Sequence, residues 1–171
     1  AQVARRREEK REAELAILRV CSIAGKFGAA IAPKPLASLI DISASELSLA
    51  AKRLFDEHLV CQLDDGTICG LHELRSAELV DQCHDGAVLL EADSLELALS
   101  VVTIETLAKF ILEAFRSFPD RTQKFVALLG QRALEEQSEF VAAALTGLGI
   151  AALDRIAEQW TQTLRRCELE P

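Results

Sequence analysis

The side chains that bind metals in proteins are few in this sequence and poorly spaced for a shared site. Zinc prefers tetrahedral sites built from cysteine and histidine, and the best candidates here are Cys69, His72, Cys83 and His84. Cys83 and His84 are adjacent, which strains tetrahedral coordination, and the overall spacing is not that of a zinc finger. We therefore expect no metal site.

Catalytic signatures are also missing from the sequence. It has no glycine-rich phosphate-binding loop, no His-Glu-x-x-His pair and no nucleophile elbow. The paired acids Asp64-Asp65 and Glu135-Glu136 are adjacent and so point in different directions, unlike a general acid and base that share one substrate. We predict that the chain has no catalytic residues and is not an enzyme by itself.

The best local signal is a β-hairpin followed by a helix. Two short apolar runs, 60–63 and 67–69, flank Asp64-Asp65-Gly66. A two-residue Asp-Gly turn would place Leu63 opposite Ile68, on the same face as Cys61. The chain then turns helical from about His72 to residue 83, where the sequence His-Asp-Gly ends the helix.

Helical patterns precede the hairpin. A helix over 5–31 is followed by two prolines and a short apolar helix over 36–40. Ser43 with Glu46 three residues later is a capping-box signature for a third helix that runs to about residue 58. Its predicted core-facing stripe consists of Leu47, Ala50, Ala51, Leu54, Phe55 and Leu59.

The second half of the chain is helical throughout. A helix over 94–118 has a possible break near Thr103, and a second helix follows Pro119. A third helix begins near Ser138 and is expected to be interrupted by glycines at 147 and 149 before a last helix over 150–167, in which Trp160 is predicted to be a packing residue. Amphipathic helices in this order stack into bundles or solenoids.

These elements predict a mainly α protein: a winged helix-turn-helix domain with a short β-hairpin wing, followed by an α-helical bundle or helical-repeat segment. Its parts are an N-terminal helical extension (1–12), a winged-helix domain (13–86) and a helical segment (94–171).

The charge distribution disfavours nucleic acid as a partner. The chain has 19 basic and 27 acidic side chains, a formal net charge of −8, and its basic surplus lies in residues 1–20, where the run from Arg5 to Arg11 is typical of a solvated helix face. The helix that would enter a DNA groove offers only Lys52 and Arg53, and Asp64-Asp65 at the wing tip would repel phosphate.

A DNA-binding transcriptional regulator that uses Lys52 and Arg53, with a helical dimerisation or effector domain, stays an alternative. A winged-helix scaffold or adaptor protein is another.

The cysteines and the lack of targeting segments favour a cytoplasmic protein. Five cysteines at irregular spacings, Cys21, Cys61, Cys69, Cys83 and Cys167, fit reduced thiols better than a disulfide framework. No signal peptide is evident, and no run of about 18 apolar residues indicates a membrane span. Since the chain lacks methionine even at position 1, we expect it to be part of a longer protein.

The residues that follow the predicted wing form a specific pattern. Residues 65–75 read Asp-Gly-Thr-Ile-Cys-Gly-Leu-His-Glu-Leu-Arg, and Leu54, Leu59 and Val60 precede the wing. This pattern resembles the end of the winged-helix domain in STAND signal-transduction ATPases, a class that includes NLR immune receptors and apoptosome ATPases. The family has Met-His-Asp or Leu-His-Asp followed by Leu and often Arg. The matching residues are Leu71, His72, Glu73, Leu74 and Arg75, with Glu73 in place of the usual Asp.

The resemblance implies that His72 senses a bound nucleotide and helps hold the ADP-bound, closed state. ATP or ADP would be bound mainly by an ATPase core N-terminal to Ala1, on the rest of a larger protein or subunit. The resemblance also implies contacts with protein partners, homo-oligomerisation on activation and a setting such as bacterial antiphage defence. The residues alone leave a second interpretation open, in which His72 simply caps or packs the start of the helix that follows it.

Overall fold

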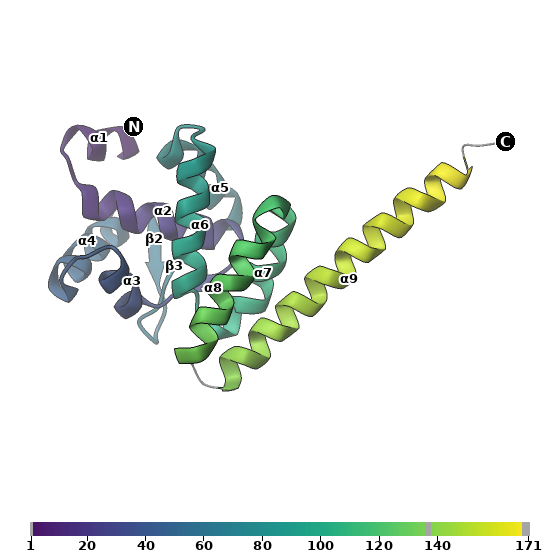
Figure 1. Ribbon diagram of the computed structural model, residues 1–171. Helices are drawn as coiled ribbons and strands as arrows, with labels where there is room; N and C mark the ends of the chain where they lie inside the picture. The colour runs from purple at the N-terminus through teal and green to yellow at the C-terminus, as the bar shows by residue number, and fades with distance from the viewer. Residues whose placement is uncertain (1, 136–137, 169–171) are drawn as a thin grey trace.

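The computed structural model describes residues 2–135 and 138–168 (Figure 1). It confirms a mainly helical chain that also contains a small three-stranded antiparallel sheet. In chain order the elements are α1 (Gln2–Glu8), α2 (Glu12–Lys26), β1 (Ala30–Ile31), α3 (Pro33–Leu39), α4 (Ala44–Asp56), β2 (Val60–Gln62), β3 (Ile68–Gly70), α5 (Glu73–His84), α6 (Val88–Val101), α7 (Ile104–Ser117), the 3-10 turn η1 (Pro119–Arg121), α8 (Thr122–Glu135) and α9 (Ser138–Glu168).

The predicted first helix over 5–31 is wrong, because the chain reverses between α1 and α2. Lys10 adopts a positive φ of 54°, which ends α1 and folds it back toward α2. This reversal buries Arg6, which is 1% exposed, beside Glu14 of α2, so the arginine run is not simply a solvated face. Arg6 Nε lies 3.0 Å from Glu14 Oε2, and Arg6 Nη2 lies 2.9 Å from Glu57 Oε2 beyond the end of α4.

The strand β1 follows α2 and was not predicted. The chain turns after Lys26 through Gly28, whose φ of +65° favours glycine. The strand order is β1-β3-β2, and Ile31 of β1 pairs with Ile68 of β3. With only two residues, β1 is too short to show a strand period in the sequence.

The predicted hairpin is present, but its register differs by one residue. Gln62 pairs with Ile68, and Leu63 N donates to Thr67 O at 3.0 Å, so the loop contains three residues rather than two. Gly66, at the last loop position, has a φ of +85°, which is typical of three-residue hairpin loops. Because a slip of one residue exchanges the faces of a strand, Leu63 is exposed while Ile68 is buried.

Most of the predicted stripe on α4 is buried, as expected from its helical spacing. The capping box is confirmed: Ser43 Oγ accepts from Glu46 N at 3.2 Å, and Ser43 N donates to Glu46 Oε2 at 3.0 Å. Leu47, Ala50 and Leu54 face the core. Phe55, predicted to be a core residue, is 48% exposed. Its assignment to the core is therefore wrong, because it lies at the edge of the buried stripe.

The second half packs directly on the first. The predicted break near Thr103 is confirmed, and it is bonded to β1: Ala32 N donates to Val101 O at 2.8 Å, and Thr103 N donates to Ala30 O at 2.9 Å. Buried side chains from Val3 to Ala151 form one cluster, so both predicted domains contribute to a shared core.

The glycines at 147 and 149 do not interrupt the last helix, contrary to expectation. Residues 138–168 form the single helix α9, which packs on α7 and then projects away from the rest of the chain (Figure 1). A Cβ on Gly147 would lie 3.0 Å from Ala108 Cα and 3.0 Å from Ile111 Cβ, so this glycine permits close packing of α9 on α7. The side chains of Trp160 and Cys167 lie outside the described residues, as does Glu136.

By length and composition alone, Ser138–Gln159 of α9 could cross a membrane. Length and composition are weak evidence for a span, so the expectation of no membrane segment stays a prediction. A mostly buried core helix of a soluble protein passes the same test, whereas 22% of this window is buried. Here the buried residues Phe140, Ala144 and Ala151 belong to the shared core.

Candidate functional site

His72, the predicted nucleotide sensor, is the N-cap residue of α5. Its backbone is extended, with φ −163° and ψ 147°, and its Nδ1 accepts a hydrogen bond from Leu74 N at 3.2 Å. An accepting Nδ1 carries no proton, so the neutral ring holds its proton on Nε2. The side chain is exposed. The site therefore presents an Nε2–H donor at the surface, while Nδ1 holds the start of the helix.

Two cavities meet at His72. One has a volume of about 680 Å³ and is also lined by Arg75 and Gln82 of α5. The other has a volume of about 400 Å³ and is also lined by Gly70 of β3 and Thr106 of α7. The imidazole thus stands between two hollows that could admit part of a ligand or of a partner protein.

Glu73 connects this site to α7. Its Oε1 accepts from Lys109 Nζ at 2.6 Å, and this hydrogen bond lowers the pKa of Glu73. Both side chains are about half exposed, so the pair adds little stability by itself. Gly28 lies next to the Glu73–Lys109 pair. A Cβ on Gly28 would come within 2.6 Å of Glu73 Oε1, so a larger residue at this position would displace the pair.

The remaining motif residues form an exposed face around His72. Leu74 is 78% exposed and Leu71 is 39% exposed, which is unusual for leucines beside an ordered helix start. Arg75 is also exposed, and within the part of the chain that the structure describes it has no ion-pair partner. We name Leu71, His72, Leu74 and Arg75 the motif face.

The motif face rests on a tightly packed base. A Cβ on Gly25 of α2 would lie 2.8 Å from Gly70 Cα, so α2 and β3 approach more closely than larger residues allow. Ser76 N donates to His72 O at 2.8 Å in the first turn of α5. These contacts fix the position of His72 relative to the sheet.

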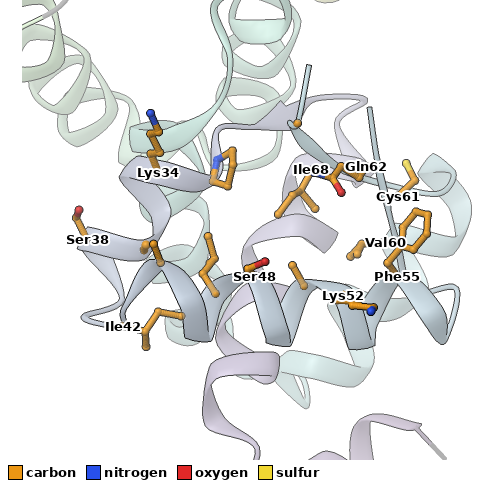
Figure 2. A pocket seen from close by; sticks show the side chains of 16 residues that line it. Lys34, Ser38, Ile42, Ser48, Lys52, Phe55, Val60, Cys61, Gln62 and Ile68 are labelled. Carbon is orange, nitrogen blue, oxygen red and sulfur yellow. The ribbon is translucent and has the colours of Figure 1, made fainter. Parts of the chain in front are cut away.

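A second concave surface lies between α3, α4 and the hairpin (Figure 2). It has a volume of about 570 Å³, and its apolar lining includes Ile42, Leu47, Phe55, Val60 and Ile68. We name it the α3–α4 groove. Figure 2 shows Lys34 on the α3 side and Lys52 on α4, at opposite sides of the groove.

The two residues of the DNA-binding alternative have different environments. Lys52 lines the α3–α4 groove, whereas Arg53 Nη1 pairs with Glu14 Oε1 at 3.2 Å. Asp64 and Asp65 are exposed at the hairpin tip, and hydrogen bonds from Thr67 lower the pKa of Asp65. The structure therefore does not bring Lys52 and Arg53 together as a phosphate-binding pair.

The candidate zinc ligands are not assembled into a site. Both ring nitrogens of His84 are engaged, with Val80 O at 2.7 Å and with Ser94 Oγ at 2.9 Å. Burial raises the pKa of Cys83 to about 11, which keeps this thiol protonated. Among the described residues, no group of three or more His, Cys, Asp or Glu side chains could hold a metal ion.

Sequence reasoning found the motif residues but missed the groove and the partner of Glu73. Lys109 comes from α7, and no local pattern relates a lysine to an acid 36 residues earlier. The signal for the groove was Phe55, which stands at the edge of the α4 stripe beside Lys52.

Comparisons with protein-family models, curated proteins and solved structures find no match to this chain. Its function must therefore be argued from these residues.

Proposed function

We propose that this chain is the non-catalytic, regulatory part of a STAND-type signalling ATPase, which couples nucleotide state to protein interaction and oligomerisation. In this proposal His72 donates its Nε2–H to a phosphate oxygen of ADP. The nucleotide is held mainly by an ATPase core on the rest of the larger protein or on another subunit. Antiphage defence is one setting that the resemblance implies. The observation that carries the proposal is that Nδ1 of the exposed residue His72 is engaged by Leu74 N, which leaves Nε2 as the donor.

The proposal treats residues 13–86 as a winged helix-turn-helix domain. Helix, short strand, two helices, hairpin and return helix follow one another in the order expected for that domain. The β1-β3-β2 order places the hairpin strands beside the strand that follows the first helix, which supports this assignment. In this arrangement His72 lies directly after the wing.

The cap gives the proposed sensor a defined geometry. Because Leu74 N occupies Nδ1, the ring presents a proton from Nε2, and a phosphate oxygen is a strong acceptor for it. The exposed leucines of the motif face would pack against the ATPase core around that contact. The Glu73–Lys109 pair would pass a displacement of α5 to α7 and so toward α9.

The test separates sensing from capping. His72→Ala removes both the cap and the donor, whereas His72→Ser keeps a good N-cap but removes the Nε2 donor. In the full ATPase, both variants are expected to lose bound ADP on purification, measured by chromatography of released nucleotide, and to signal without a trigger. His58→Asn is the matched control, since His58 is exposed and asparagine tolerates its φ of 54°.

If His72→Ser retained wild-type ADP content while His72→Ala lost it, the role of His72 would be capping, and the sensor proposal would fail. Unchanged ADP content in both variants would also contradict it.

One observation favours a second candidate, a winged-helix DNA-binding regulator: Lys52 is exposed on the helix that would enter the major groove. Against it stand the ion pair of Arg53 with Glu14 and the acids at the hairpin tip. A salt titration of binding to random duplex DNA distinguishes the two. Tight binding with a steep loss of affinity as salt rises would favour the regulator.

A further inference from the structure

The α3–α4 groove differs in charge from the rest of the protein. The chain carries a net charge of −8, yet the groove lining contains two lysines and no aspartate or glutamate. Lys34 and Lys52 are both exposed, and within the described residues neither has an ion-pair partner. An apolar surface flanked by unpaired cations is therefore available on an otherwise acidic molecule.

Phe55 marks the groove as a binding surface. The sequence contains seven phenylalanines, and Phe55 alone among them is exposed, at 48%. Figure 2 shows its ring near Val60 and Cys61, where α4 faces the hairpin. Large aromatic side chains at the edge of a concave apolar surface commonly serve as anchors in protein interfaces.

We propose that the α3–α4 groove binds an acidic amphipathic helix of a partner protein. The apolar side chains of that helix would pack on Phe55 and on the partly exposed Ile42 and Ala51, and its flanking carboxylates would pair with Lys34 and Lys52. A helix fits better than an extended peptide, because two of the three walls are helices whose backbone groups are already bonded internally.

Charge also distinguishes this occupant from nucleic acid. Asp64 and Asp65 lie at the tip of the hairpin that forms one wall, and they would repel a continuous phosphate backbone. A short acidic helix can keep its carboxylates near the two lysines and away from that tip. The inference does not depend on nucleotide sensing, since His72 does not line this groove.

The test uses the full chain and a displayed library of 16-residue helical peptides. Each peptide carries Leu, Ile or Phe at i, i+3, i+4 and i+7, and its other positions are randomised. Selection is expected to enrich Asp and Glu at positions flanking the apolar face. Phe55→Ala is expected to weaken binding of a selected peptide at least tenfold, measured by fluorescence anisotropy.

Charge reversal provides a sharper readout. The double variant Lys34→Glu/Lys52→Glu is expected to bind the acidic peptide more weakly than the wild type does. It should bind more tightly a peptide in which the flanking acids are replaced by lysine. Two controls are matched in type: Leu49→Ala, an exposed apolar residue on α4 outside the groove, and Lys10→Glu with Arg155→Glu, exposed cations elsewhere. Circular dichroism and thermal melting confirm that each variant is folded.

The proposal would be overturned if selection enriched no peptide or enriched basic or uncharged flanks. Binding that survives Phe55→Ala, or preference for random duplex DNA over the selected peptide, would also overturn it. A His72→Ser chain should bind the peptide as the wild type does, so failure here and failure of the nucleotide proposal are separable.

Discussion

The guanidinium of Arg6 lies 3.0 Å from the carboxylate of Glu14, and both side chains are almost completely buried. Removing Arg6 takes away the buried partner of Glu14, whose carboxylate then keeps only the more exposed Arg53 and Arg11. We expect Arg6→Met to lower the free energy of unfolding by about 3 kcal/mol, measured by urea denaturation. Replacing Glu14 as well, by Leu, should recover much of that loss. Arg5→Met, at a side chain that is 63% exposed, is the control and should change stability little.

The cap on α5 makes a second prediction. His72→Ala should destabilise this chain by about 1 kcal/mol, because the N–H of Leu74 loses its acceptor. His72→Ser should restore most of that stability in thermal melts. Equal stability of the wild type and the alanine variant would show that the hydrogen bond from Leu74 N to His72 Nδ1 does not stabilise the protein in solution.

A third prediction concerns pH. Burial lowers the pKa of His84 from its ordinary value of 6.5, while the hydrogen bond to Val80 O and nearby Glu91 oppose the shift, and Arg19 and Lys26 add to it. Because the unfolded chain binds this proton more readily, stability should fall as pH falls below 6.5. Replacing His84 with Gln should flatten that part of the stability curve, measured by denaturation between about pH 7 and about pH 5.5. A curve of unchanged slope would contradict the prediction.

The two glycines of α9 give a matched pair. A Cβ on Gly149 meets nothing within 4 Å, so Gly149→Ala should stabilise the chain by up to about 1 kcal/mol through helix propensity. Gly147→Leu should destabilise it, because its side chain would collide with α7 at Ala108 and Ile111. Thermal melting of both variants checks the pair. The same shift for both would show that α9 does not pack on α7 at Gly147.

Short sequence patterns at helix ends correctly predicted where some helices begin and end. Ser43 with Glu46 marked the start of α4, and residues 84–86 marked the end of α5, where Asp85 and Gly86 both adopt positive φ. Such helix ends depend on a few neighbouring residues, so they can be predicted from one sequence without knowledge of the tertiary structure. Of the candidate site, His72 and its neighbours were identified by the resemblance of residues 71–75 to a short family motif.

Long-range packing decided the features that the sequence did not reveal. The strand β1 exists because β3 and the break at Val102 bond to it. Gly147 remains helical because α7 lies against it, and Phe55 is exposed because none of the described residues occupies the groove beside it. Neither periodicity nor propensity contains this information.

The projecting part of α9 has a mechanical consequence. Asp154 pairs with Arg116 of α7 at 2.7 Å, and α9 continues past this pair to Glu168. At 1.5 Å per residue, residues 155–168, which follow this pair, extend about 21 Å. If α7 and α9 turn together by about 10°, simple lever geometry moves the far end by roughly 4 Å relative to the pair over that length. If the two helices move as one body, a small tilt of α7 beside Lys109 therefore becomes a larger displacement at the far end of α9.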